Sequence, residues 1–312
     1  MKPLKASELH GNWGTLLLPI NPDDSIDWDL LGREIDQLLL AGVDGIYSNG
    51  SAGEFHTQTE AEFERVSALL AQKCYAAGRP FQIGACHPSA QISRERIRRT
   101  KTLQPSAFQV ILPDWFPPRW PEILSFLETV AAEAAPIPLV LYNPPHAKRR
   151  LDPAEWLELA EAIPSLIGIK VPSGDDAWYE AMQPVMKRLS VFIPGHQLAT
   201  GLARGAHGAY SNVACLSPRG AQRWYEHCRY DPAIGFAWQS AIQSFWEGNI
   251  APLITRDHLC NMAADKAAAA AGGWLRGFSP RLRWPYHSAD ADTVRRIAER
   301  SHAELPAAFF ES

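Results

Sequence analysis

The chain has 312 residues, of which 46% are hydrophobic and 21% are charged, proportions that indicate a folded globular protein and exclude a disordered one. Its net charge of -4 provides no basic surface that would attract nucleic acid or an anionic membrane, so we expect neither as a partner. Five scattered cysteines without a Cys-x-x-Cys pair predict neither a disulfide framework nor a zinc site, and no apolar run reaches the length of a signal peptide or membrane span, which predicts a cytoplasmic protein.

Short apolar segments alternate with amphipathic segments along the first two thirds of the chain. The apolar segments predict eight strands, at residues 15–19, 45–48, 81–85, 108–112, 139–143, 167–170, 191–194 and 208–211. Helical patterns with apolar residues at spacings of three and four lie between them, for example at 28–41, 59–77, 121–135 and 154–163. Eight such repeats favour a closed (β/α)8 TIM barrel, and an open doubly wound sheet is the alternative because the segment 208–211 is short.

The strand pattern stops near residue 217. Helical patterns continue without another strand, at 221–228, 233–246, 252–271 and 293–302. We therefore expect a barrel over residues 1–217 and a C-terminal helical extension over residues 218–312, packed on the barrel or on a neighbouring subunit.

The active site of such a barrel lies at the carboxyl ends of its strands, which directs attention to Lys170 and Tyr142. Lys170 is the only one of eight lysines that ends an apolar segment. Burial at a barrel mouth would lower the pKa of its amine and make it a nucleophile toward a carbonyl group, although a lysine whose stem packs on the strand end fits the pattern equally well. Tyr142 ends the preceding segment and can transfer a proton, although a single tyrosine there is more often a packing residue.

A glycine-rich segment, Ser48-Asn49-Gly50-Ser51-Ala52-Gly53-Glu54, follows the second predicted strand. Its exposed backbone amides can hold a carboxylate without a cationic side chain. Taken alone, the segment is better explained as a turn that needs glycine for its dihedral angles.

Together, these segments resemble the dihydrodipicolinate synthase / N-acetylneuraminate lyase family of class I aldolases, which form Schiff bases. The resemblance extends from about Trp13 to Pro218. It rests on three motifs in the same order along the chain, Gly50-Ser51-Ala52-Gly53-Glu54, Tyr142-Asn143-Pro144-Pro145 and Gly168-Ile169-Lys170-Val171-Pro172-Ser173-Gly174-Asp175.

The resemblance implies a lyase in which Lys170 forms an imine with pyruvate or another 2-oxo acid, with no metal and no organic cofactor. Tyr142 would relay protons, and Ser51 would link Tyr142 to solvent or substrate. The implied substrate-binding residues are Gly50, Ala52, Trp115, Gly195, Gln197, Tyr210, Ser211 and Asn212. The family also implies a homo-oligomer, a dimer or a tetramer built from dimers.

Several positions depart from the members that this chain resembles. Dihydrodipicolinate synthases carry a second hydroxyl residue at Ala52, a tyrosine at Trp115 and an arginine near Ala147, and N-acetylneuraminate lyases carry an aspartate at Gln197. These differences disfavour both reactions, although the basic residues that follow Ala147 would restore the missing cation after a loop shift. The substrate, and the choice between aldol cleavage, condensation and dehydration, therefore stay open.

Two further hypotheses come from other functional classes. A barrel that binds an oxo acid without turnover would fit the loss of hydroxyl groups at Ala52 and Trp115. A metal-dependent aldolase would draw its ligands from the histidines, but these share no tight motif: His56, His87, His196 and His207.

Overall fold

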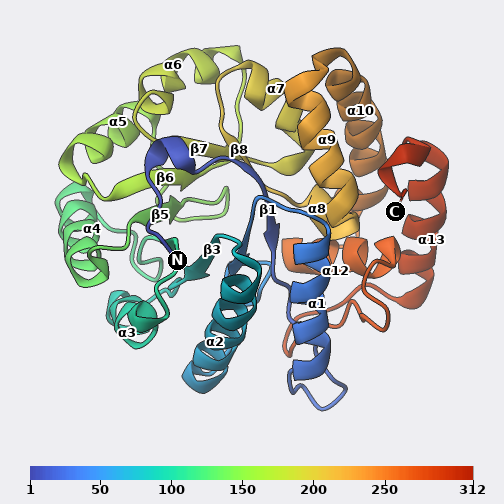
Figure 1. The fold of residues 1–312 in the computed structure, drawn as a ribbon, viewed down its shortest axis with the longest axis horizontal. Helices are drawn as coiled ribbons and strands as arrows, with labels where there is room; N and C mark the ends of the chain where they lie inside the picture. Colours follow the sequence, from blue (N-terminus) through green and yellow to red (C-terminus); the bar gives the residue numbers. More distant parts are fainter. Residues whose placement is uncertain (312) are drawn as a thin grey trace.

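The computed structural model describes residues 1–311, and within them eight parallel strands form a closed barrel (Figure 1). The strands are β1 Gly11–Thr15, β2 Gly45–Ser48, β3 Phe81–Gly84, β4 Ala107–Val110, β5 Leu139–Tyr142, β6 Leu166–Lys170, β7 Ser190–Ile193 and β8 Gly208–Tyr210. Each strand pairs with the next along the chain, and β1 closes the barrel against β8. The predicted (β/α)8 barrel is therefore confirmed, and the open sheet is wrong.

Alternating side chains of each strand face opposite sides of the sheet and supply two separate cores. On β2, Ile46 packs outward against the surrounding helices, whereas Tyr47 faces inward and packs with Trp13 and Tyr210 inside the barrel. On β2 both of these positions are apolar or aromatic, so the strand appears in the sequence as a continuous apolar segment.

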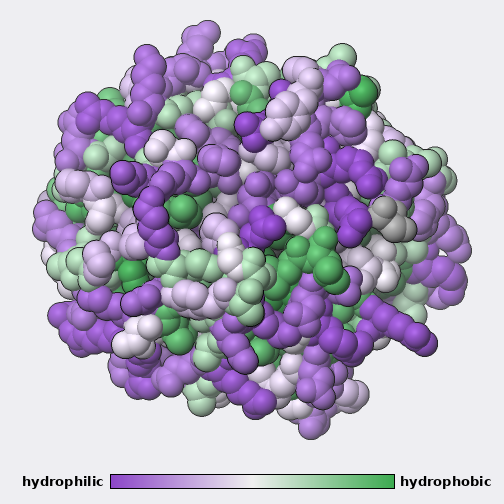
Figure 2. All heavy atoms as spheres, in the orientation of Figure 1, coloured by the Kyte–Doolittle hydropathy of each residue, from purple (hydrophilic) through white to green (hydrophobic). Residues whose placement is uncertain are grey.

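Helices cover the outside of the barrel (Figure 1). They are α1 Trp28–Leu40, α2 Glu60–Ala77, α3 Ala90–Thr100, α4 Trp120–Ala134, α5 Pro153–Ala162, α6 Asp176–Met186 and α7 Leu198–Ala203. Capping side chains fix where several of them begin: Asp27 accepts from the backbone N–H of Leu30 at the start of α1, and Asp175 does the same for Trp178 at the start of α6. The face shown in Figure 2 is mostly hydrophilic, with apolar side chains in small patches.

Helices after β8 form a layer on one side of the barrel, drawn in orange and red in Figure 1. They are α8 Val213–Leu216, α9 Pro218–Tyr230, α10 Pro232–Phe245, α11 Ala251–Thr255, α12 Asn261–Gly272 and α13 Ala291–Glu304. Most of their buried side chains share one apolar cluster with Leu17 and Ala52 of the barrel. The boundary at residue 217 stays a prediction, and the last residue of the range 218–312 lies outside the described residues.

Two predicted elements are wrong in position. The first strand is β1, which begins four residues before the predicted 15–19 and includes the buried polar residue Asn12, whose side chain donates to Gln222 (3.1 Å) and whose backbone N–H donates to Asp44 (2.8 Å). The predicted helix 252–271 is interrupted between α11 and α12, where His258 has a positive φ of 55° that ends the helical ladder.

Within residues 1–311, none of the helices combines the length and the apolar composition that crossing a bilayer requires.

Candidate active site

Lys170 and Tyr142 lie side by side at the carboxyl end of the barrel. They end the neighbouring strands β6 and β5, and the strand register places them directly opposite each other. The Lys170 Nζ is 4.2 Å from the centroid of the Tyr142 ring. An amine and a phenol are thus presented together at the end of the barrel where such folds place their chemistry.

A second tyrosine, Tyr47, approaches the same amine from inside the barrel. The Lys170 Nζ donates a hydrogen bond to the Tyr47 hydroxyl at 3.2 Å. Burial raises the pKa of Tyr47, so its hydroxyl stays protonated at neutral pH. Sequence reasoning missed this residue because Tyr47 stands within an apolar strand. Its inward position on β2 becomes visible only once the barrel is closed.

The environment of Tyr142 keeps its phenol protonated. Burial raises the pKa of Tyr142, and the charge of Lys170 and the hydroxyl of Ser51 oppose that rise. Once an amine has bonded to a carbonyl carbon, the oxygen on that carbon must be protonated before it leaves. A protonated phenol beside the amine can donate that proton. Tyr142 can therefore serve as a general acid at this position.

Asp265 of α12 adds a carboxyl group to the surroundings of Lys170. Burial raises the pKa of Asp265 from its ordinary value of 3.8 to about 7, and the positive charge of Lys170 opposes the rise. The negative charge of Asp265 in turn acts on Tyr47 and Tyr142. A carboxyl group that titrates near neutral pH is suited to proton transfer, and no local motif in the sequence pointed to it.

The glycine-rich loop after β2 is packed too closely for larger residues. A Cβ on Gly50 would lie 2.8 Å from the Tyr47 ring, and a Cβ on Gly53 would lie 2.8 Å from the main-chain oxygen of Leu16. Glu54 at the end of the loop has a positive φ of 49°. The loop therefore adopts one defined conformation against the barrel, which presents Ser51 to the site.

Glu54 is held from the other side by the C-terminal layer. Its carboxylate forms an ion pair with Lys266 of α12, and both side chains are 0% exposed. The backbone N–H of Arg283 donates to the second carboxylate oxygen at 3.1 Å. Burial lowers the pKa of Lys266, and Glu54 opposes this shift. The helical layer thus fixes the end of the glycine-rich loop.

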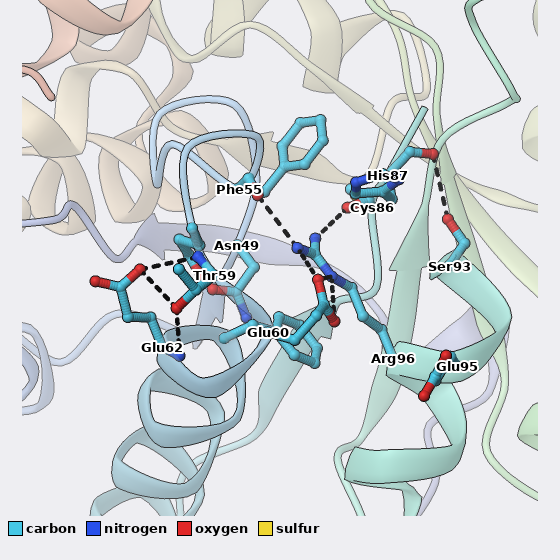
Figure 3. A network of polar contacts seen from close by, with 12 residues as sticks. Asn49, Phe55, Thr59, Glu60, Glu62, Cys86, His87, Ser93, Glu95 and Arg96 are labelled. Carbon is cyan, nitrogen blue, oxygen red and sulfur yellow. Dashed lines mark hydrogen bonds and ion pairs between the residues drawn. The ribbon is translucent and has the colours of Figure 1, made fainter. Parts of the chain in front are cut away.

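Arg96 of α3 fixes the chain just beyond this loop (Figure 3). Its buried guanidinium donates to the main-chain oxygens of Cys86 (2.6 Å) and Phe55 (3.4 Å) and pairs with Glu60 at 2.8 Å. Because the guanidinium is planar and offers several donors, one side chain can join three segments. Phe55 is thereby positioned at the mouth of the barrel.

A cavity of about 720 Å³ opens beside Tyr142. Ser51 and Tyr142 line it, together with residues of the loop after β5 and of the segment that leads into α12. This volume is sufficient for a small organic substrate. Lys170 is not part of the cavity wall, but it adjoins Tyr142, which is.

The other predicted substrate-binding residues lie outside the cavity wall over residues 1–311, and they stay predictions. Gly195, Ser211 and Asn212 are grouped, and the Asn212 side chain pairs with His196 at 3.0 Å. Tyr210 faces the barrel interior, where its ring centroid lies 5.5 Å from the Lys170 Nζ and its hydroxyl donates to Gln82 at 2.7 Å.

The remaining three predicted residues are also spread out. Ala52 is buried in the loop. Gln197 has a buried side-chain oxygen without a hydrogen-bond partner within the described part of the chain. Trp115 is 77% exposed, and the Lys148 amine lies 5.2 Å from its ring. None of these residues belongs to the wall of the cavity beside Tyr142 among residues 1–311.

The histidines considered as metal ligands do not converge. Over the described residues, no group of three His, Cys, Asp or Glu side chains is arranged to hold a metal ion. His87 accepts from the backbone of Ser89 and His207 accepts from that of Val191. No observation favours the metal-dependent aldolase.

Known proteins are similar to this chain in sequence and in fold. Residues 8–232 match the model of the dihydrodipicolinate synthetase family. The chain is 30% identical over 206 residues to an N-acetylneuraminate lyase of Rhizobium meliloti (strain 1021), which covers 65% of this chain and 67% of that protein. It is 27% identical over 244 residues to a 4-hydroxy-tetrahydrodipicolinate synthase of Stenotrophomonas maltophilia (strain R551-3), covering 77% of this chain and 81% of the relative.

Solved structures show the same fold at lower sequence identity. The pyruvate complex of YagE, a prophage protein of the dihydrodipicolinic acid synthase family from E. coli K12, superposes with a TM-score of 0.83 at 21% identity and covers 95% of this chain and 98% of its own. The N-acetylneuraminate lyase of Fusobacterium nucleatum superposes with a TM-score of 0.82 at 18% identity, covering 96% and 100%.

Proposed function

Since this chain belongs to the dihydrodipicolinate synthetase family and is a lyase, we propose that it forms a Schiff base between Lys170 and pyruvate or another 2-oxo acid. The observation that carries this proposal is the position of the Lys170 amine, 4.2 Å from the Tyr142 ring and hydrogen-bonded to Tyr47 at 3.2 Å. A nucleophilic amine and two phenols from three strands lie close together, an arrangement suited to imine formation.

The proposed reaction begins with attack of the Lys170 amine on the C2 carbonyl of the oxo acid. A C–N bond forms, the carbonyl oxygen takes up protons and leaves as water, and Tyr142 donates one of those protons. The backbone amides of Ser51 and Ala52 would bind the substrate carboxylate, and Gly50 allows the loop to approach closely. The resulting protonated imine withdraws electrons from C3.

With a 4-hydroxy-2-oxo acid the electron pair of the C3–C4 bond moves into the enamine. The C4 hydroxyl loses its proton to a base, and an aldehyde leaves. The enamine takes up a proton at C3, and water hydrolyses the imine to pyruvate and free Lys170. The electrons needed at each step come from the substrate and the lysine, so the proposal includes no cofactor.

The site is poorly suited to dihydrodipicolinate synthesis. Ala147 supplies no cation for a second carboxylate. Arg149 lines the cavity, but its guanidinium forms an ion pair with Glu155 and donates to the main-chain oxygen of Arg150 at 2.7 Å. We also propose a homo-oligomer, with the exposed Trp115 and Phe116, 77% and 80% accessible, as the contact between subunits.

Borohydride trapping tests the imine. The protein is incubated with pyruvate and sodium borohydride, digested, and analysed by mass spectrometry for a reduced adduct. We expect the adduct on Lys170, its loss in Lys170→Ala, and its retention in Lys187→Ala, which changes an exposed lysine at the end of α6. Absence of an adduct with a panel of 2-oxo acids would overturn the proposal.

The same variants separate a lyase from a barrel that only binds an oxo acid. Turnover of any 2-oxo acid that disappears in Lys170→Ala eliminates the binding protein. Thermal stabilisation by the oxo acid without any product would favour it instead.

A further inference from the structure

Apolar side chains from distant parts of the chain converge on the cavity beside Tyr142. Phe55 follows the glycine-rich loop, Leu112 follows β4, and Met262 lies in the first turn of α12. These three side chains are only 7%, 5% and 6% exposed, so they form a fixed wall. These three side chains offer apolar contact and no hydrogen-bonding group to a ligand.

An aromatic cluster forms another part of the same wall. The His56 ring meets the Phe55 ring edge to face, with centroids 5.3 Å apart, and meets the Tyr286 ring in the same way at 5.1 Å. Burial lowers the pKa of His56 to about 4, so this imidazole is neutral at pH 7. Edge-to-face stacks of neutral rings are surfaces on which a further aromatic ring packs well.

The charged groups in the wall already make contacts within the protein. Arg149 is engaged by Glu155 and by the main chain of Arg150. Asp114 accepts a hydrogen bond from the backbone N–H of Lys148 at 3.1 Å. A ligand carboxylate placed here would have to compete with Glu155 for the guanidinium.

Two amides lie in the wall: Asn261, the exposed first residue of α12, and Asn143, whose side chain is already hydrogen-bonded within the protein. Asn143 donates to the main-chain oxygen of Arg149 at 2.8 Å and accepts from the backbone N–H of Leu151 at 3.0 Å. A polyhydroxylated ligand would therefore leave many of its hydroxyl groups without partners, and burying an unpaired polar group is unfavourable.

We propose that this cavity holds the aldehyde half of the aldol reaction, and that this aldehyde is uncharged and largely apolar, with an aromatic ring as the preferred group. The inference rests on the proposed Schiff-base function and names its substrate class. In the direction of synthesis, C3 of the Lys170 enamine bonds to the aldehyde carbon, and the aldehyde oxygen takes up one proton to become the C4 hydroxyl. Hydrolysis of the imine then releases a 4-aryl-4-hydroxy-2-oxo acid.

The test compares aldehydes of similar size at one saturating pyruvate concentration. The probes are benzaldehyde, glyceraldehyde and succinic semialdehyde, and the measurement is kcat/KM for formation of the hydroxy oxo acid, with the Lys170→Ala protein as background. We expect the value for benzaldehyde to exceed the other two by at least about tenfold, because selection by an apolar pocket reaches this size for even small apolar differences.

Met262→Gln introduces a polar group of similar length into the wall. It should lower kcat/KM for benzaldehyde about tenfold while pyruvate still labels Lys170, which shows that the variant is folded. Ile254→Gln, at a position that lines the same cavity and is 36% exposed, provides a second variant under less packing constraint. Leu40→Gln, at a side chain 67% exposed on α1, is the matched control and should change neither measurement.

The outcomes separate this inference from the function on which it rests. Preference for glyceraldehyde or succinic semialdehyde, or failure to condense any aldehyde while Lys170 is labelled by pyruvate, would overturn the apolar-aldehyde assignment and leave the Schiff base intact. Failure of every 2-oxo acid to label Lys170 would overturn both.

Discussion

Replacing Lys266 by methionine should both destabilise the protein and weaken its binding of the oxo acid. The substitution keeps the length of the side chain but removes the cation that pairs with Glu54, at a place where both side chains are 0% exposed. It also removes the hydrogen bond from the Lys266 Nζ to the main-chain oxygen of Arg281, at 2.7 Å. The Glu54 carboxylate would remain buried beside the backbone N–H of Arg283 without a balancing charge.

The expected cost follows from the burial of the pair. Removing one partner of a buried ion pair costs about 3–5 kcal/mol, because a charge is left uncompensated in a region of low dielectric constant. The double variant Lys266→Met/Glu54→Gln removes both charges and should recover most of that loss. Because Glu54 ends the loop that carries Ser51, we expect the KM for pyruvate to rise by a larger factor than kcat falls.

The assay is urea-induced unfolding of the parent and the variants, together with steady-state kinetics. Lys73→Met is the matched control, because it breaks an ion pair with Asp36 that is 26% and 50% exposed and should cost at most about 1 kcal/mol. If Lys266→Met costs no more than this control, or if the double variant is no more stable than the single one, the buried pair does not hold the loop.

Asp265→Asn should alter the pH dependence of stability. As the pH rises from about 4 to about 7, the parent protein loses stability relative to the variant, because Asp265 still holds its proton in the folded state but has released it in the unfolded state. The loss is at most about 4 kcal/mol at roughly 1.4 kcal/mol per pKa unit, and urea titrations that give a pH-independent difference would contradict the burial of this carboxyl group. Tyr142→Phe should lower kcat by about 10²- to 10⁴-fold, and an unchanged kcat would remove Tyr142 from the proton transfers. Tyr47→Phe keeps the ring but removes the 3.2 Å hydrogen bond to Lys170, so we expect a smaller loss, about tenfold, with a displaced pH profile of kcat. Arg96→Lys should lower the free energy of unfolding by about 2–3 kcal/mol, because an ammonium group cannot join Arg96's three segments. A urea midpoint equal to that of the parent would show that the guanidinium contacts are dispensable.

Hydrophobic patterning was sufficient to predict the barrel and the strand-end positions of Lys170 and Tyr142. Burial on both faces of a parallel strand produces a continuous apolar run, and the end of that run is visible in the sequence wherever a polar residue follows. The same reasoning misplaced β1, which includes the buried polar Asn12, a hydrogen-bond donor to Gln222 of a distant helix. It also missed the break before α12, which depends on the backbone conformation of His258.

Tertiary structure alone decided what surrounds the amine. Tyr47 and Asp265 lie 123 and 95 positions from Lys170 along the chain, and no local pattern relates them to it. Periodicity records which side of one segment is buried, whereas the electrostatic surroundings of a group are a sum over segments that only the closed barrel and its helical layer bring together. The sequence by itself therefore determined the fold and the location of the nucleophile, Lys170. The packing of α12 against the barrel determined which carboxyl group lies near the Lys170 amine and which residues line the adjoining cavity.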